Sequence, residues 1–290
     1  MSPDDSAATL VGLNSGETAP PAVYIAPQDG IPWYEQSAIV AHALGSIDGR
    51  SESNSAEAFM ATYAKGQRVF EVDLVLTSDN KLVARHDFAD DSYYTLEQQI
   101  PAAGKLMDSR TFTETPIMGL YTPVTIDDIT GWLETYDDIW IITDTKATDA
   151  ETIKTQFELL RDAINSDALL ERVIVQLYNY EMYDTVNSVY PFKNYILTLY
   201  QLDDRDYNKI GKFCAEHSVA VVVMPVSIAD DKTTKTLHSY GLHVYLHTVN
   251  RITTMGTMIL YNLCDGFYSD YVTQPELQKY TEPATAKKAK

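Results

Sequence analysis

The sequence predicts a (β/α)₈ barrel. Eight short apolar runs alternate with amphipathic segments, and polar side chains recur at the carboxyl ends of those runs. Eight strands in roughly 240 residues, most followed by a helix, are typical of this barrel. An open doubly wound sheet is the lesser alternative, because no Gly-x-Gly-x-x-Gly follows the first run. The expected strands are 38–42, 68–74, 138–146, 172–178, 194–200, 219–225, 242–249 and 265–270.

The segments between these runs carry helix signals. Helices are expected at 54–66, 125–136, 149–164 and 231–241. For the first of them, Asn54 or Ser55 is a suitable N-cap, and Gly66 stands where a glycine commonly ends a helix. The alternation of strand and helix is therefore supported by local chemistry as well as by hydrophobicity.

Three segments interrupt this alternation. Residues 1–36 are rich in Pro and Ala without periodicity, so we expect an extension or linker before one domain at 37–280. Residues 87–124 are aromatic and turn-rich, and we expect an insertion that covers one end of the barrel, or else irregular surface packing. Residues 281–290 are expected to be a disordered tail.

The bulk composition limits the partners. The 290 residues are 45% hydrophobic and carry a formal charge of −19, which argues against nucleic acid, whose phosphates are bound by clustered Lys and Arg. No apolar stretch approaches the length of a membrane span, and the first residues do not resemble a signal peptide. The tether-like start and 20 tyrosines favour a secreted or surface-attached protein whose export signal is missing over a cytoplasmic one. Cys214 and Cys264 are either two buried thiols or one disulfide.

The run FEVDLVLTSDNKLVARHD, residues 70–87, carries the first sign of chemistry. Residues two apart on a strand share a face, so Glu71 and Asp73 point together, opposite the apolar face of Phe70 and Val72. The apolar face suits packing against helices, which puts both carboxylates inside the barrel near the carboxyl end of the strand. Two neighbouring carboxylates stay ionised only with a cation nearby, and oxygen ligands suit Ca²⁺ or Mg²⁺.

Other predicted strands end on comparable side chains. Asp144 and Lys146 share a face at the end of 138–146, His42 ends the first strand, and His86 ends the run LVARH. His247 ends a later strand and is a candidate pocket residue. The carboxyl ends of the strands form the catalytic face of such barrels, so these side chains are expected to converge.

These motifs resemble the glycerophosphodiester phosphodiesterase family, part of the phosphatidylinositol-phospholipase-C-like barrel group. That family has His-Arg-Gly after the first strand, a Glu-Asn-Thr helix start, Glu-x-Asp on the second strand, a Thr-x-Asp-Gly turn and then His-Asp. The matching segments here are IVAHALG, SNSAEAF and GQRVFEVDLVLTSDNKLVARHD. Further on, TDTK, HTVN and DGFYSDY resemble the family's Glu-Ile-Lys, Trp-Thr-Val-Asn and Asp-Gly-Ile-x-Thr-Asp strand ends. The likeness extends from residue 38 to about residue 272.

The resemblance implies a metal-dependent hydrolase that releases glycerol phosphate and an alcohol from glycerophosphodiesters. In this reading a divalent ion, Ca²⁺ or Mg²⁺, is bound by three carboxylates, two histidines form the acid–base pair, and a lysine contacts the phosphate or an oxygen ligand of the metal. Residue by residue, these are Glu71, Asp73 and Asp144 for the metal, His42 and His86 for proton transfer, and Lys146 for the phosphate.

Two positions depart from the family pattern. The family's arginine after the first histidine is Ala43 here, and Arg50 or Arg85 is the substitute to consider, although Arg85 is expected to face away from the His86 side. His247 stands where the family has Trp. Both changes indicate an altered substrate pocket, in which we expect Arg50 and His247 to contact substrate.

Three functions follow from these observations. The first is hydrolysis of soluble glycerophosphodiesters or lipid headgroup diesters such as glycerophosphocholine. The second is a phospholipase or lyase acting on intact phospholipid or on a cell-envelope glycerophosphate polymer, which leaves peripheral association with a membrane or cell envelope open. The third is a phosphodiester-binding barrel without catalysis, for which Ala43 is the main argument.

Overall fold

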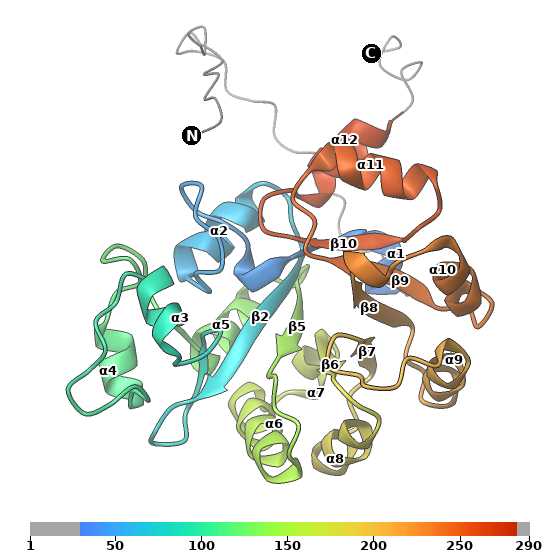
Figure 1. The fold of residues 1–290 in the computed structure, drawn as a ribbon. Helices are drawn as coiled ribbons and strands as arrows, with labels where there is room; N and C mark the ends of the chain where they lie inside the picture. Colours follow the sequence, from blue (N-terminus) through green and yellow to red (C-terminus); the bar gives the residue numbers. More distant parts are fainter. Residues whose placement is uncertain (1–29, 283–290) are drawn as a thin grey trace, which may run out of the picture.

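The computed structural model describes residues 30–282 of the chain. Eight parallel strands form a closed barrel, because β1 pairs with β2 on one side and with β10 on the other. Helices surround the strands (Figure 1). The predicted (β/α)₈ barrel is confirmed, and each of the eight predicted runs coincides with one barrel strand, although β2 extends two residues beyond its run. The barrel strands are β1 (Ile39–Ala41), β2 (Val69–Leu76), β5 (Trp140–Asp144), β6 (Val173–Leu177), β7 (Asn194–Thr198), β8 (Val221–Pro225), β9 (His243–His247) and β10 (Gly266–Ser269).

The longer helices begin with the caps that their sequences encode. The hydroxyl of Ser55 accepts a hydrogen bond from the amide of Ala58, and Gly66 follows the helix end with a φ of 92°. Thr125 and Asp128 form a reciprocal capping box. The helices are α1 (Trp33–Gln36), α2 (Ala56–Ala64), α3 (Asp90–Thr95), α4 (Ser109–Glu114), α5 (Ile126–Thr135), α6 (Ala150–Ile164), α7 (Asp167–Leu170), α8 (Glu181–Val189), α9 (Tyr207–Glu216), α10 (Asp231–His238), α11 (Ile252–Leu260) and α12 (Gln274–Thr281), with 3₁₀ turns at η1 (His42–Leu44) and η2 (Val226–Ile228).

Two hydrophobic clusters divide the barrel into an inside and an outside. The inner cluster takes side chains that point into the barrel, among them Val69 of β2 and Tyr245 of β9. The outer cluster fills the layer between strands and helices, and Phe70, Val72 and Leu74 belong to it. The alternation predicted for β2 is therefore confirmed, and Glu71 and Asp73 face inward.

The amino-terminal end of the barrel interior is filled by aromatic rings. Trp33 of α1 is buried and lies edge-on to Tyr245, with ring centroids 5.7 Å apart. This helix falls within the segment expected to be an extension; residues 1–29 of that segment lie outside the described residues, as do residues 283–290 of the expected tail. The interior is thus packed at this end, which leaves the carboxyl end of the strands for chemistry.

The segment 87–124 carries small elements of its own. The chain leaves β2 through an antiparallel hairpin to β3 (Leu82–Ala84), and β4 (Val124–Thr125) pairs with β3 on the far side. Between them, α3 and α4 lie on the β2 side of the barrel (Figure 1). Tyr93, Met107 and Phe112 pack on Val83 in a separate apolar cluster. The segment is therefore anchored by its own buried side chains.

Two sequence-level questions are answered by the fold. Cys214 and Cys264 are both buried free thiols in the described part of the chain, so of the two alternatives the structure has the unpaired one. No helix within residues 30–282 is long and apolar enough to cross a membrane.

Candidate active site

Three carboxylates converge at the carboxyl end of the barrel. Asp73 of β2 and Asp144 of β5 are register partners on neighbouring parallel strands, so their side chains lie side by side. Glu71 lies two residues earlier on the same face of β2. One oxygen from each of the three side chains lies within 4.8 Å of the others, and all three residues are buried. The structure therefore brings together Glu71, Asp73 and Asp144, as the alternation on their strands predicted.

Hydrogen bonds orient two of these carboxylates from the loop that follows β1. The amide of Ala43 donates to Glu71 Oε2 at 2.7 Å. The side chain of Asn54 donates to Asp73 Oδ2 at 2.8 Å and accepts from the Asp73 amide at 3.1 Å. Ala43 and Asn54 both have a positive φ, of 47° and 48°. The loop thus holds a rarely populated backbone conformation that aims both groups at the carboxylates.

Lys146 is the cation that the structure places among these acids. Its ammonium forms an ion pair with Asp73 and a second, 3.1 Å long, with Asp144. Burial disfavours the charge on Lys146, but Asp73 and then Asp144 outweigh that effect, so the pKa of the ammonium lies above its ordinary value. Lys146 stays charged, and it compensates at most one of the three carboxylates.

The electrostatic balance differs between the two carboxylates of β2. For Asp73, burial opposes ionisation, but Lys146 and His42 outweigh burial and hold the pKa of Asp73 below its usual value. For Glu71, burial and then the charge of Asp73 raise the pKa well above its ordinary range. Glu71 Oε1 is buried and has no hydrogen-bond partner among the described residues. If all three carboxylates ionised, Glu71 would be the one that the cations around it leave uncompensated.

This donor set fits a divalent cation. Hard cations such as Ca²⁺ and Mg²⁺ prefer carboxylate oxygens, and the three carboxylates come from two adjacent strands of a rigid barrel. The unpaired oxygen of Glu71 points to the same conclusion, because a bound cation would offset the burial that raises the pKa of Glu71 and would give this oxygen a partner. Glu71, Asp73 and Asp144 are the residues that would hold it.

His42 lies beside the carboxylates and is held by a residue that the sequence analysis did not single out. Its Nδ1 lies 2.8 Å from Asp270 Oδ1 at the end of β10. Asn250 donates to the other oxygen of Asp270 at 2.6 Å and accepts from its backbone amide at 2.9 Å. Since Nδ1 is engaged, Nε2 is the atom left for proton transfer. Asp270 follows inward-facing Tyr268 by two residues, so the alternation applied to β2 would also have found it.

The charge state of His42 follows from its neighbours. Burial alone would lower the pKa of the imidazole, but the hydrogen bond that it donates to Asp270 and the charges of Glu71 and Asp73 outweigh burial and raise the pKa to about 10. His42 is therefore protonated at neutral pH in this environment, which suits the role of a proton donor.

His86 differs from His42 in its setting. It lies two residues beyond β3, the antiparallel partner of β2, and its side chain is 51% exposed. Its Nδ1 lies 2.6 Å from Asp87 Oδ2, and the other oxygen of Asp87 accepts from the Ser92 hydroxyl and the Ala89 amide. The charge of His86 also contributes to lowering the pKa of Asp73. Each of the two histidines thus has a carboxylate that fixes its ring.

The two arginines considered as substitutes for the family's arginine both face the segment 87–124. Arg85 is buried, donates to Gln98 Oε1 at 2.6 Å and lies against the rings of Phe88 and Tyr93. These contacts hold its guanidinium against the segment 87–124. Arg50 forms an exposed ion pair of 2.6 Å with Glu97. The contacts of both arginines thus support loops around the site.

His247 ends β9 on the inner side of the barrel. Its ring lies edge-on to that of Tyr200, with centroids 5.8 Å apart. Burial and the charge of His42 lower the pKa of His247 to about 4, so its imidazole is neutral at neutral pH. Its Nε2 is buried and has no partner within the described chain, so it can still form a hydrogen bond with a ligand.

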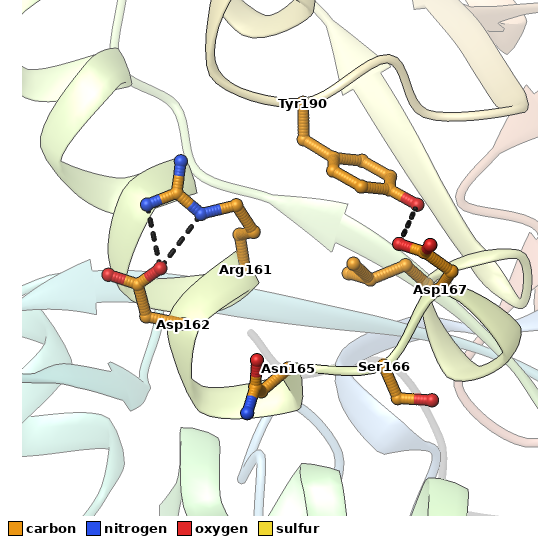
Figure 2. Close-up of a pocket in the computed structure, with 7 residues that line it drawn as sticks. Arg161, Asp162, Asn165, Ser166, Asp167 and Tyr190 are labelled. Carbon is orange, nitrogen blue, oxygen red and sulfur yellow. Dashed lines mark hydrogen bonds and ion pairs between the residues drawn. The ribbon is translucent and has the colours of Figure 1, made fainter.

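A pocket of about 330 Å³ lies elsewhere and has a different character (Figure 2). It is formed by the end of α6, the start of α7 and Tyr190, which precede β6 and β7, so it lies toward the amino ends of the strands. Its charged groups are paired: Arg161 pairs with Asp162, and the Tyr190 hydroxyl donates to Asp167 at 2.8 Å. The carboxylate cluster is therefore the better candidate for catalysis.

Comparison with known proteins agrees with this assignment. The model of the "Glycerophosphoryl diester phosphodiesterase family" matches residues 45–274. No curated protein matches the sequence significantly. Among solved structures, a putative glycerophosphoryl diester phosphodiesterase from Silicibacter pomeroyi is 15% identical over 84% of this chain and 92% of its own, with a TM-score of 0.65.

Two further structures show the same fold. A glycerophosphodiester phosphodiesterase from Parabacteroides distasonis is 16% identical, covering 84% of this chain and 95% of its own, with a TM-score of 0.64. A phosphodiesterase from Oleispira antarctica, solved in complex with the product sn-glycerol-3-phosphate, is 14% identical, covering 85% of this chain and 97% of its own, with a TM-score of 0.65. At these identities the likeness establishes the barrel.

Proposed function

On the premise that the chain belongs to the glycerophosphoryl diester phosphodiesterase family and is a hydrolase of phosphodiester bonds, we propose that it cleaves glycerophosphodiesters with a divalent cation and two histidines. The products are glycerol phosphate and an alcohol. The observation that carries the proposal is the buried cluster of Glu71, Asp73 and Asp144, with one carboxylate oxygen unpaired, beside His42.

The bound cation supplies Lewis-acid chemistry, because it offsets negative charge that grows on the phosphate oxygens during the reaction. Lys146 lies on the same side of the cluster, and its ammonium binds the phosphate while remaining paired with Asp73. The phosphate is thereby oriented toward the two histidines.

The two histidines divide the proton transfers according to their environments. His42 is protonated at neutral pH and donates a proton from Nε2 to the departing alkoxide. His86 is more exposed and accepts the proton of the attacking hydroxyl. Asp270 and Asp87 keep the two rings oriented, because each accepts at Nδ1 and leaves Nε2 toward the substrate.

The proposed contacts with the rest of the substrate involve His247 and Arg50. The unpaired Nε2 of His247 is available to a hydroxyl of the substrate. Arg50 lies on the loop after β1, and its ion pair with Glu97 is solvent-exposed and therefore weak, so the guanidinium is easily released for an anionic substrate. We propose both as substrate contacts.

Hydrolysis of glycerophosphocholine with and without chelator tests the metal proposal. We expect EDTA to abolish turnover and Ca²⁺ or Mg²⁺ to restore it, and Glu71→Gln, Asp73→Asn and Asp144→Asn to behave like the chelated wild type. Full activity in excess chelator would exclude the metal.

Variants of the two histidines test the proton transfers. His42→Ala and His86→Ala should each lower kcat by about 10²- to 10⁴-fold while cation binding is retained. His217→Ala serves as a control, because this imidazole contacts only Tyr183 and Phe213 in the described structure. Full turnover in both active-site variants would exclude the acid–base assignment, whereas a wild type that binds the diester without any turnover would be the phosphodiester-binding barrel.

The substrate and the nucleophile need separate assays. Parallel rates on soluble headgroup diesters and on micellar phospholipid distinguish a headgroup hydrolase from a phospholipase, and we expect the soluble diesters to be preferred. A ³¹P time course then distinguishes water from a substrate hydroxyl as nucleophile, because only the hydroxyl route passes through a cyclic phosphate.

A further inference from the structure

The third carboxylate of the cluster is held differently from the other two. Glu71 accepts a hydrogen bond from a backbone amide, and Asp73 is held by Asn54 on its carboxylate and its amide and by the ammonium of Lys146. Asp144 is held by two side chains: the hydroxyl of Tyr178 donates to Oδ1, and Lys146 lies 3.1 Å from Oδ2. Of these two groups, Tyr178 is the one that carries no charge.

Tyr178 is in a rigid position to do this. It follows β6 directly, it is fully buried, and its ring lies edge-on to Tyr200, with centroids 6.0 Å apart at 77°. Because the side chain has no exposed surface, it does not touch substrate. Any effect of its hydroxyl on the reaction must therefore pass through Asp144.

A row of polar groups inside the barrel supports the hydroxyl. Tyr268 of β10 donates to Gln176 Oε1 at 3.2 Å, and Gln176 Nε2 lies 3.5 Å from the oxygen of Tyr178. Each group in this row donates to the next, so the proton of the Tyr178 hydroxyl is left for Asp144. The row runs across the barrel from β10 to β5, below the carboxylate cluster.

The hydrogen bond also determines which acceptor positions of the Asp144 carboxylate remain free for a cation. Each carboxylate oxygen offers two lone pairs, so one acceptor position remains on Oδ1 and one on Oδ2 after Tyr178 and Lys146 are satisfied. Without the hydroxyl, Asp144 has only Lys146 as a partner, and the carboxylate is free to rotate toward that ammonium and away from Glu71. Partners of this kind hold metal ligands in orientation, and their loss typically weakens metal affinity by about 10- to 100-fold.

We propose that Tyr178 is a positioning residue, whose hydroxyl fixes the carboxylate of Asp144 for a divalent cation. The inference rests on the proposed metal-dependent function and names the side chain that completes the ligand set. Its role is to orient Asp144, with no contact to the substrate.

Cation titration of Tyr178→Phe tests the proposal without any substrate present. Phenylalanine keeps the ring and its packing on Tyr200, so the variant removes only the hydroxyl. Isothermal titration with CaCl₂ and MgCl₂ should show a Kd about 10- to 100-fold above that of the wild type. At saturating cation, kcat on glycerophosphocholine should return to within about threefold of the wild type, because Tyr178 does not contact substrate.

Tyr195→Phe is the matched control. The Tyr195 hydroxyl is also buried but has no hydrogen-bond partner in residues 30–282, and its ring packs on Tyr183. We expect its loss to leave the cation Kd unchanged.

The outcomes separate the two proposals. If the wild type binds neither cation, the metal-dependent function fails and Tyr178 loses its role with it. If the wild type binds a cation and Tyr178→Phe binds it equally well, only the present inference is overturned. The inference is also overturned if Tyr195→Phe weakens binding as much, because that result would indicate a general effect on packing.

Discussion

The substitution Asp270→Asn tests whether Asp270 orients His42 and keeps it protonated as a proton donor. Asp270 accepts hydrogen bonds on both oxygens, from His42 Nδ1 at 2.8 Å and from Asn250 Nδ2 at 2.6 Å. An asparagine has one oxygen and one amide nitrogen, so one of the two donors would face a second donor. The substitution keeps the size of the side chain but removes the orientation of the imidazole together with the charge that favours its protonation.

The magnitude follows from the pair itself. A hydrogen bond to a charged group contributes about 1.5–3 kcal/mol, and 1.36 kcal/mol corresponds to one pH unit, so Asp270→Asn should lower the pKa of His42 by about 1 to 2 pH units. In the wild type this pKa is raised from 6.5 to about 10. His42 must be protonated to act, so it controls the alkaline limb of the pH profile of kcat, and this limb should move to lower pH. Loss of an oriented proton donor should lower kcat by about 10²- to 10⁴-fold.

The pH dependence of stability has a definite sign. The folded-state pKa of His42 lies above its unfolded value, so its stabilising contribution is complete below pH 6.5 and is lost as the pH rises toward about 10. Asp270→Asn should thus cost most stability at low pH. Urea unfolding at a series of pH values measures this, in parallel with the titration of the His42 ring protons by NMR.

Asp265→Asn is the matched control for Asp270→Asn. Asp265 precedes β10 at the opposite end of the barrel, and it makes a pair of the same length, 2.8 Å, with His238. It should change stability but leave kcat and its pH profile as in the wild type. Our account of His42 is refuted if Asp270→Asn retains more than half of the wild-type kcat, or if the two variants lose activity equally.

Four other predictions follow from the same contacts. Asn54→Ala should weaken Ca²⁺ or Mg²⁺ binding by about 10- to 100-fold in calorimetric titration, since Asn54 orients Asp73; unchanged affinity would contradict that role. Lys146→Met should destabilise the metal-free protein by about 3 kcal/mol in urea unfolding, because it leaves Asp73 and Asp144 uncompensated, and added cation should recover most of the loss; equal stability without metal would show that the pairs contribute little. Glu71→Gln should stabilise the metal-free protein above pH 4.5 while abolishing cation binding, since a carboxyl with a raised pKa loses stability as the pH rises through it; a destabilised variant at pH 8 would be inconsistent with this sign. Ser55→Ala should cost about 1 kcal/mol of unfolding free energy through the lost α2 cap without changing kcat, and a large loss of activity would instead place Ser55 in the site.

Much of this protein is determined by local sequence. The period of two in β2 places Phe70 and Val72 on one face and Glu71 and Asp73 on the other, and the structure has both faces as predicted. The same reasoning located Asp144, His42 and the eight strands. Such features depend on the pleat and on the burial of apolar faces, which are properties of a few adjacent residues.

Tertiary structure determined the contacts that the alternation of side chains along a strand does not predict. Three of the supporting contacts join residues far apart in the sequence: Asp270 lies 228 residues from His42, Asn54 lies 19 from Asp73, and Tyr178 lies 34 from Asp144. Each contact forms only because the barrel closes or a loop folds back. The same is true of Arg85, which is held by Gln98 in the segment 87–124. A hydrogen bond between distant residues forms only when its donor–acceptor distance is right to within a few tenths of an ångström. Only the packed barrel fixes positions that closely.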